Sequence, residues 1–441
     1  MKIAFIGLGA IGLPIARRLA LHPDLELSLY DTRLEVLEAE AELGRVASSV
    51  ADAVVDADVV ITVLPADAHV RSVAREVAVA ARPEQTFLDF STIAPGTMLD
   101  VAELLQAAGV RSLGGSLTRS VAAAETGTLS VFVGGPIDLI EPLRPALDQI
   151  ASDVRIVDTV AAAKALKIVN NMIVSSLGLV LCETILVGAR HGVDPHELVV
   201  AVAAGGGDSW PLHNHIVKHL LADDLGPGRF SVRYMGKDAA LASQLAGTHG
   251  QPAWFAGLVE AAYRGAESLG LGEHYHPIVM RWLEHAASVP PVTGQQATLG
   301  ESEGPVTPVV DALCRGVVAL QALITLDALR LVACEGVPVD AALEHFESGS
   351  ASNDCVRALL AAEPDRSAAM TMADLVADLT ATCGLAAQAA VPGTAFEVGR
   401  NIALALVAEH GEDLTATEVI ERVPVALRRT PQYTNLEGRL S

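Results

Sequence analysis

The first twelve residues limit the possible folds of this chain more than any other segment. A short apolar strand, residues 2–6, runs directly into Gly7-Leu-Gly9-Ala-Ile-Gly12, and a helical pattern follows. In such a turn the first glycine permits the bend, the second lets backbone approach a pyrophosphate, and the third allows close helix packing. A second apolar strand ends in Asp31, where a carboxylate hydrogen-bonds an adenosine ribose. We therefore predict a dinucleotide-binding turn formed by Gly7, Leu8, Gly9, Ala10, Ile11 and Gly12.

Short apolar segments alternate with helical patterns up to about residue 160, as expected for a doubly wound parallel sheet. The predicted strands are residues 2–6, 25–30, 59–64, 86–90, 110–113, 130–133 and 155–157. The alternation then stops, and one helical pattern runs from Ala161 to His191. The predicted fold class is α/β, with an N-terminal Rossmann domain followed by an all-α domain.

The all-α part is predicted to be duplicated. Ala189-Arg-His-Gly-Val193 resembles Ala333-Cys-Glu-Gly-Val337, a shift of 144 residues from Ala189 to Ala333. Chance alignment of two alanine-rich helices is the alternative. The expected parts are an NAD-binding domain (1–160), a helical catalytic domain (161–287), a linker rich in proline and glycine (288–307) and a second helical domain (308–441).

Charge and cysteine usage exclude several classes of protein. The formal net charge of −23 disfavours nucleic acid and anionic membranes, so a small anionic substrate requires a local cationic pocket. The five cysteines lie far apart without metal-ligand spacing, so we expect buried thiols, a cytoplasmic location and no metal site. The most apolar helical stretch, 172–188, contains Glu183, which argues against a membrane span.

Lysine is rare in this chain. Of 30 basic residues only Lys2, Lys164, Lys167, Lys218 and Lys237 are lysines. An amine can exchange a proton whereas a guanidinium cannot, so a retained lysine is a candidate for chemistry. Lys167, Asn170 and Asn171 fall at i, i+3 and i+4 on one helical face. We expect a catalytic site on this face, where Lys164 could lower the pKa of Lys167 as a second cation.

Six ordered motifs carry a family resemblance. They are Gly7 to Gly12, Val63-Leu-Pro65, Asp89 to Thr97, Gly127-Thr-Leu129 with Gly134-Gly135, Lys167-x-x-Asn-Asn171, and Phe230 running to Lys237-Asp238. Over residues 1 to 285 the chain resembles the β-hydroxyacid dehydrogenase family, which includes 3-hydroxyisobutyrate dehydrogenase and tartronate semialdehyde reductase.

The resemblance implies hydride transfer between a nicotinamide and a small 3-hydroxy acid or its semialdehyde. It places Leu64, Pro65 and Thr92 beside the nicotinamide and makes Lys167 the catalytic acid or base. It also implies that Asn171 positions the substrate and that Lys237 reaches the cofactor. Asp31 favours NAD as cofactor, and NADP stays open because Arg33 could accept a 2′-phosphate.

The chain departs from the family where the substrate binds. The family's Ser-Gly-Gly turn corresponds to Thr118, Arg119 and Ser120, which we predict to bind substrate together with Asn170 and Asn171. Arg119 is predicted to clamp an anionic group in bidentate fashion. The alternative is that Arg119 pairs with an acidic surface residue. Tyr275-His-Pro277 also replaces the family's usual aspartate and serine.

Other functions stay open at this point. A 6-phosphogluconate-type decarboxylating dehydrogenase fits the doubled helical part, but its lysine motif has His-Asn in place of Asn170-Asn171. An imine reductase usually lacks the lysine, and a non-catalytic NAD-binding protein needs no polar face. Asp311, Cys314 and Arg315 stand in the second copy where Lys167, Asn170 and Asn171 stand in the first. The second copy is therefore expected to be structural and to take the place of a partner subunit's helical domain, although a homo-oligomer stays open.

Overall fold

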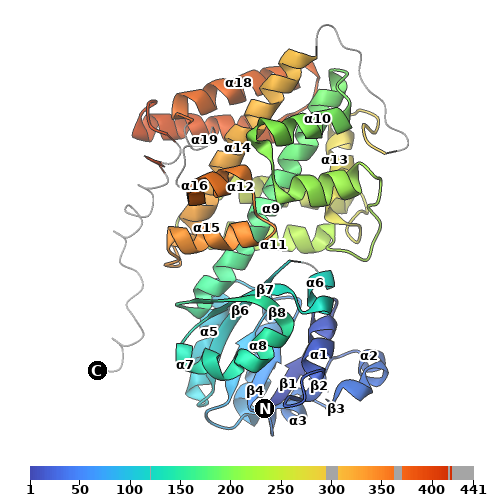
Figure 1. Ribbon diagram of the computed structural model, residues 1–441, viewed down its shortest axis with the longest axis vertical. Coiled ribbons are helices and arrows are strands. Elements are labelled where there is room, and N and C mark those ends of the chain that lie inside the picture. Colours follow the sequence, from blue (N-terminus) through green and yellow to red (C-terminus); the bar gives the residue numbers. More distant parts are fainter. Residues whose placement is uncertain (120, 295–305, 362–369, 416–417, 420–441) are drawn as a thin grey trace. The chain divides into compact units, whose positions relative to one another are not determined.

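The computed structural model describes residues 1–119, 121–294, 306–361, 370–415 and 418–419 (Figure 1). The chain forms two compact units, Met1–Ile168 and Val169–Ser441. The division falls inside helix α9 (Val160–Arg190), a few residues after the predicted domain border at 160. Residues 295–305 of the predicted linker lie outside the described residues.

Unit 1 confirms the predicted α/β fold class. Its eight-stranded sheet has the order β3-β2-β1-β4-β5-β6-β7-β8. The strands are β1 (Lys2–Ile6), β2 (Glu26–Tyr30), β3 (Arg45–Val46), β4 (Val59–Thr62), β5 (Thr86–Asp89), β6 (Arg111–Thr118), β7 (Leu129–Gly134) and β8 (Ala151–Val157). The sequence analysis missed β3, which has only two residues and is exposed.

The predicted doubly wound parallel sheet contains one antiparallel pair. Strands β6 and β7 pair antiparallel, whereas the other neighbouring pairs are parallel. Residues 119–128 connect them. A parallel crossover needs a dozen or more residues, so this shorter connection, which carries the small helix α6 (Val121–Thr126), reverses the chain direction instead.

Both faces of the sheet are buried, which explains its continuous apolar strands. Alternate residues of β1 point to opposite sides: Ile3 and Phe5 join one apolar cluster, and Ala4 and Ile6 join the other. Helices α1 (Gly12–Ala20) and α8 (Arg144–Ile150) contribute to the first cluster. Helices α3 (Val50–Val54), α4 (Asp67–Ala80) and α5 (Pro95–Ala107) contribute to the second.

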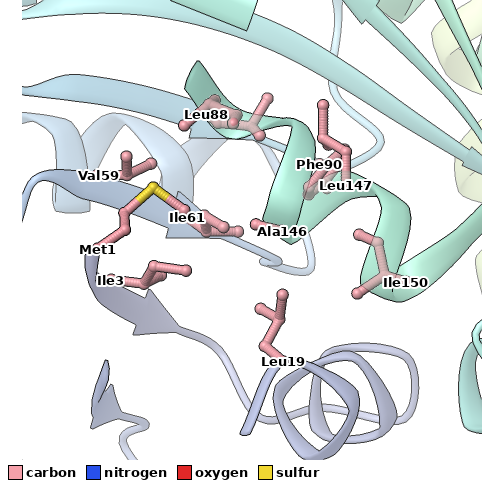
Figure 2. Close-up of a pocket in the computed structure, with 11 residues that line it drawn as sticks. Met1, Ile3, Leu19, Val59, Ile61, Leu88, Phe90, Ala146, Leu147 and Ile150 are labelled. Atoms are coloured by element: carbon pink, nitrogen blue, oxygen red, sulfur yellow. The ribbon is translucent and has the colours of Figure 1, made fainter. Parts of the chain in front are cut away.

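The first apolar cluster contains a small cavity of about 10 Å³, shown in Figure 2. Its lining is wholly apolar and includes Met1, Ile3, Leu19 and Leu88. A buried water needs two or more polar partners, so this cavity is a dry packing gap and no ligand site.

Unit 2 is helical. Its elements after α9 are α10 (Pro195–Val202), η3 (Ala203–Gly207), η4 (Leu212–Leu220), α11 (Val232–Thr248), α12 (Trp254–Ser268), η5 (His276–Ile278), α13 (Val279–Ala286), α14 (Thr307–Ala333), α15 (Val339–Ser348), α16 (Asp354–Ala361), α18 (Met372–Gln388) and α19 (Thr394–His410). Two long helices, α9 and α14, each precede a set of shorter ones (Figure 1). The paired helices α11 and α12 recur as α18 and α19.

The turns after the two long helices are the same in the predicted register. Gly192 and Gly336, which are 144 residues apart, have φ of 80° and 77°. Beyond each glycine the chain returns a hydrogen bond to the helix, from Val193 N to Gly188 O (2.9 Å) and from Val337 N to Val332 O (3.2 Å). This geometry requires a left-handed residue, for which glycine is suited. We call residues 160–286 the first repeat and the described part of 307–415 the second repeat.

Helices α9 and α14 are long and apolar enough to cross a membrane by length and composition. Their most apolar windows are 100% and 78% buried inside the protein. A helix that is apolar on all sides packs this way in the core of a folded domain.

Candidate active site

The glycine turn after β1 has the geometry that a dinucleotide requires. Gly7 has φ of 103°, and a Cβ there would lie 2.3 Å from Val63 O. A Cβ at Gly12 would lie 2.1 Å from Gly7 O. A Cβ at Gly9, in contrast, would meet no described atom within 4 Å. Two of the glycines are therefore demanded by the fold, whereas Gly9 opens a space next to the N-terminus of α1, where an anion binds favourably.

Three loops leave the same edge of the sheet at one level. Ile6 pairs with Thr62, and Thr62 pairs with Asp89. The strands are parallel, so the glycine turn, the Leu64-Pro65 segment and the segment of Thr92 all begin side by side. From β1 the chain adds β2 and β3 on one side and β4 and β5 on the other side of the sheet. Ligands of doubly wound sheets bind at the carboxyl ends of the strands where the order changes sides in this way.

A buried carboxylate, Asp89, fixes these loops. It accepts hydrogen bonds from the hydroxyls of Thr62 and Ser91, each at 2.6 Å, and Ser91 Oγ accepts one from Leu64 N at 2.8 Å. Lys164 Nζ lies 2.6 Å from Asp89 Oδ2, and both side chains are almost fully buried. The ammonium also donates to the carbonyls of Asp89, Ser91 and Gly115.

This arrangement gives Lys164 a structural role that the sequence analysis did not predict. Its charge is paired with that of Asp89 in the interior of unit 1. It joins the first turns of α9 to the carboxyl end of β5 and to the middle of β6. The sequence analysis missed Asp89 as the partner because the two residues are 75 positions apart.

Asp31 directly follows β2 and is hydrogen-bonded to the glycine turn. Its carboxylate accepts from Leu8 N (2.7 Å), Arg33 N (2.9 Å) and the Arg33 guanidinium (3.0 and 3.1 Å). Burial alone would raise the pKa of Asp31, but these hydrogen bonds and the charge of Arg33 lower it below its ordinary value. The carboxylate is therefore ionised and held against the loop of Leu8.

The segment predicted to bind the anionic group lies at the end of β6. Asp89 pairs with Gly114, so β6 extends past the end of β5 through Thr118. Arg119 has φ of 78°, a left-handed conformation at the position where the resemblance places a glycine. Its Nη1 donates to Thr128 O (2.5 Å) and Ser152 Oγ (3.0 Å). Ser120 lies outside the described residues.

A row of polar side chains runs across unit 2 from α11 to the second repeat. Lys237 Nζ lies 3.1 Å from Asp238 Oδ1, and Asn171 Nδ2 donates to Asp238 Oδ2 at 2.6 Å. Asn170 Nδ2 donates to Asn171 Oδ1 (3.2 Å) and to Ser350 Oγ (3.1 Å). The structure thus brings together Lys237, Asn171 and Asn170, which were predicted as site residues.

Two members of this polar row were missed by the sequence analysis. Asp238 is 1% exposed and lies one turn after the buried Met235, so a carboxylate interrupts the apolar face of α11. That interruption of the pattern was a usable signal. Ser350 belongs to the second repeat, 180 residues from Asn170, and no local pattern distinguishes it.

The segment Tyr275-His276-Pro277 forms a buried aromatic cluster. The His276 ring lies 4.4 Å from that of His215, and the Tyr263 hydroxyl is 3.0 Å from His276 Nδ1. Burial lowers the pKa of His215 to about 3 and the pKa of His276 well below its usual range. Both imidazoles are therefore neutral at physiological pH.

Comparisons with known proteins agree with this geometry. Residues 2–161 match the family profile for the NAD-binding domain of 6-phosphogluconate dehydrogenase. Residues 161–283 match that for the NAD-binding region of NADP-dependent 3-hydroxyisobutyrate dehydrogenase. The 3-hydroxyisobutyrate dehydrogenase of Pseudomonas aeruginosa is 33% identical over 254 residues, which cover 54% of this chain and 83% of that protein. The chain belongs to the β-hydroxyacid dehydrogenase family.

Other members of this family act on different hydroxy acids. The 2-(hydroxymethyl)glutarate dehydrogenase of Eubacterium barkeri is 26% identical over 67% of this chain and 99% of its own length. A solved structure of 3-hydroxyisobutyrate dehydrogenase from Mycobacterium tuberculosis with L-serine superposes with a TM-score of 0.59 at 26% identity. It covers 64% of this chain and 98% of that one. As a β-hydroxyacid dehydrogenase, this protein is an NAD(P)-dependent oxidoreductase.

Proposed function

We propose that this enzyme interconverts a small 3-hydroxy acid and its semialdehyde with NAD, using Lys167 as the acid or base. One observation carries the role of Lys167. Every other side chain of α9 from Val160 to Ala189 is buried, and Lys167 alone is partly exposed. A partly exposed lysine on an otherwise buried apolar helix, one turn before Asn171, is suited to exchange a proton with a bound ligand.

A nicotinamide cofactor held at the glycine turn and Asp31 would supply the hydride acceptor for oxidation of the hydroxyl-bearing carbon of the substrate. The deprotonated amine of Lys167 takes the hydroxyl proton, which balances the loss of two electrons and two hydrogens as the alcohol becomes a carbonyl. The Asn171 amide, fixed by its 2.6 Å bond to Asp238, orients the reacting oxygen. In the reductive direction the Lys167 ammonium returns the proton.

The substrate is proposed to carry a carboxylate. Relatives are named for 3-hydroxyisobutyrate, L-serine and 2-(hydroxymethyl)glutarate, which are all hydroxyl compounds with at least one carboxyl group. Thr118, Arg119 and Ser120 are proposed to contact that carboxylate. The Arg119 bonds to Thr128 and Ser152 engage Nη1, and a bidentate contact uses another pair of donors, Nε and Nη2.

The second repeat is proposed to take the place of a partner subunit's helical domain. Its α14 packs on α10, η3 and α12 of the first repeat. Chemical crosslinks in solution between the first repeats of two chains would contradict this proposal. The five cysteines, all within the described residues, form no disulfide with one another, which is consistent with the proposed cytoplasmic location.

The role of Lys167 can be tested with Lys167→Ala and Lys167→Arg. We expect each to lower kcat by roughly 10²- to 10⁴-fold, because neither side chain exchanges a proton near neutral pH. NAD affinity, measured by calorimetry, should stay unchanged. The exposed Lys218→Ala is the matched control. Full turnover by Lys167→Ala would show that another group moves the proton.

A further inference from the structure

The two helical repeats meet around an approximate two-fold axis. Ser209 pairs with Asn353 in an antiparallel bridge, and the two residues are equivalent in the 144-residue register. Trp210 N donates to Ser352 O at 2.8 Å. Its symmetry mate is present as well: Asp354 N donates to Asp208 O at 3.0 Å. Each repeat thus donates one backbone hydrogen bond to the other repeat, and the two bonds join equivalent positions.

The reciprocity extends to helix caps far from this bridge. Glu183 on α9 accepts from Ala395 N at the start of α19, at 2.9 Å. Asp327 on α14, which is 144 residues after Glu183, accepts from Phe255 N at the start of α12, at 3.3 Å. Contacts in which i meets j and j meets i define an isologous interface, the arrangement of a symmetric dimer. Here both halves of such an interface lie in one chain.

Symmetry then predicts two equivalent contacts between a long helix and the opposite loop, and they differ in chemistry. In one, Asn170 of α9 meets Ser350 at 3.1 Å. In the other, Cys314 of α14 meets the loop of Gly205 and Gly206, where a Cβ on Gly205 would lie 3.3 Å from the Cys314 Cβ. Of these two contacts, the one on the helix that carries Lys167 has a hydroxyl facing an amide, and the other has neither group.

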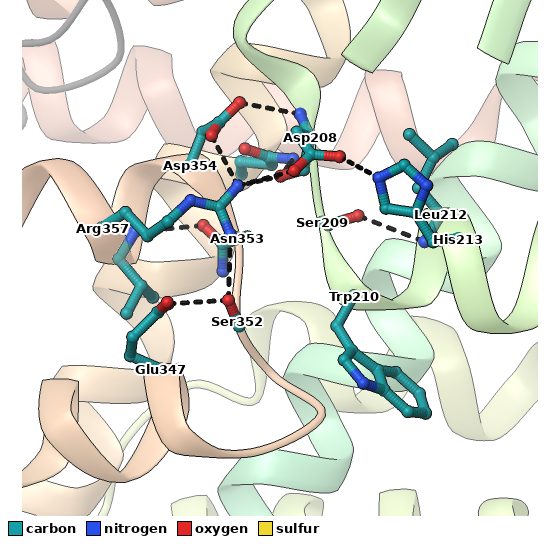
Figure 3. A network of polar contacts seen from close by, with 12 residues as sticks. Asp208, Ser209, Trp210, Leu212, His213, Glu347, Ser352, Asn353, Asp354 and Arg357 are labelled. Carbon is teal, nitrogen blue, oxygen red and sulfur yellow. Dashed lines mark hydrogen bonds and ion pairs between the residues drawn. The ribbon is translucent and has the colours of Figure 1, made fainter. Parts of the chain in front are cut away.

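The loop that carries Ser350 is held rigidly. Arg357 donates to Asp208 Oδ2 (2.9 Å) and to Ser352 Oγ (3.0 Å), and Ser352 donates to Glu347 (2.7 Å), as Figure 3 shows. Asn170 is fully buried, and its Oδ1 has no hydrogen-bond partner among the described residues. The Ser350 hydroxyl thus holds the amide nitrogen of Asn170 in place. The amide oxygen of Asn170 is left as a hydrogen-bond acceptor.

We infer that the second repeat completes the substrate site of the first through Ser350, a positioning residue that orients the Asn170 amide for a polar group of the hydroxy acid. This inference rests on the proposed function. The Ser350 hydroxyl fixes which atom of Asn170 faces the ligand, and it stands at the end of the polar row that begins at Lys237. The pseudo-equivalent contact between Cys314 and Gly205 has no amide and no hydroxyl side chain, so the described part of the chain holds one such site.

The test measures steady-state kinetics of the full chain with NAD and three substrates, 3-hydroxyisobutyrate, L-serine and 2-(hydroxymethyl)glutarate. Ser350→Ala removes one neutral hydrogen bond, so KM for the best substrate should rise by roughly two- to tenfold. KM for NAD and the melting temperature should not change. Ser350→Thr, which keeps the hydroxyl, should restore the wild-type KM.

Ser348→Ala is the matched control, because Ser348 lies two residues away in the same segment and donates only to His345 O in its own helix. It should leave all constants unchanged. Wild-type turnover with a KM that Ser350→Ala leaves unaltered would overturn the inference alone. No turnover of any of the three acids by wild-type enzyme, with NAD or NADP, would overturn the proposed function and the inference with it.

Discussion

At the scale of single residues, the choice of cofactor depends on Asp31 and Arg33. Asp31 is ionised and fixed by Leu8 N, while the Arg33 side chain, 49% exposed, lies against the same carboxylate. A carboxylate at this place accepts from a ribose hydroxyl and repels a 2′-phosphate. The guanidinium of Arg33 would favour that phosphate once the carboxylate no longer holds it.

Asp31→Asn should therefore shift the preference from NAD toward NADP. The amide oxygen can still accept from Leu8 N, so the loop keeps its acceptor while the charge is removed. Loss of a charged hydrogen bond corresponds to roughly a tenfold or larger fall in the ratio of NAD to NADP affinity, measured by calorimetry. Asp24→Asn removes the same charge from an exposed position at the other end of β2 and should not change the ratio. If Asp31→Asn left the ratio of NAD to NADP affinity unchanged, a group other than Asp31 would determine which cofactor is preferred.

The residues of the cofactor turn could be predicted because their roles are local. A side chain at Gly12 would collide with Gly7 O, and one at Gly7 would collide with Val63 O, next to the adjacent strand. The spacing of the glycines in the sequence follows from these two contacts. Ser350 could not be predicted in the same way. Its partner Asn170 lies 180 residues away, and a lone serine in a loop carries no periodicity.

At the scale of elements, the start of α9 is fixed to the sheet by one buried ion pair. Lys164 and Asp89 are 1% and 0% exposed, and their charged atoms lie 2.6 Å apart. Removing one partner of a buried pair leaves a charge without compensation in a medium of low dielectric constant. The position of the helix that carries Lys167 therefore depends on a residue that takes no part in the proposed chemistry.

Lys164→Met should lower the free energy of unfolding by roughly 3–5 kcal/mol in urea denaturation. Combining it with Asp89→Asn should recover part of this loss, because no buried charge then remains. Lys218→Met, the same substitution at an exposed lysine, should stay within about 0.5 kcal/mol of wild type. A Lys164→Met protein as stable as wild type would show that the pair contributes nothing to the fold.

The elements also show where sequence patterns fail. The long apolar helix α9 and strands β1, β4 and β5 were predicted near their observed bounds, since their patterns extend over several residues. Strand β3 was missed because two exposed residues give no alternation. The direction of β7 was missed because the length of a connection, and not the pattern of a strand, decides parallel or antiparallel pairing.

At the scale of the whole molecule, the reciprocal caps make the pairing of the two repeats sensitive to pH. Burial raises the pKa of Glu183 to about 7 despite the backbone hydrogen bonds from Ala395 and Thr394, and the nearby Glu397 adds repulsion. Glu183 thus keeps its proton up to about pH 7 in the folded protein, but only to about 4.5 when unfolded. The folded state binds more protons between these values, so stability falls as pH rises through this window.

Glu183→Gln should flatten this part of the stability curve. Between pH 5 and pH 8 its free energy of unfolding should fall by roughly 2–3 kcal/mol less than that of wild type, as measured in urea at each pH. The glutamine oxygen can still accept from Ala395 N. Glu397→Gln, an exposed carboxylate in the first turn of α19, should keep most of the wild-type slope. Equal slopes for Glu183→Gln and wild type would contradict the assigned protonation.

The bridge between Ser209 and Asn353 has an evolutionary consequence. In a dimer of identical subunits the residue on the two-fold axis meets its own copy, so every mutation there occurs on both sides at once. Here the two sides are encoded separately, and they already differ, serine facing asparagine. Each half can therefore change without altering the other. Substitutions around Cys314 thus leave the residues around Asn170 unchanged, so that half of the interface is free to acquire a ligand of its own.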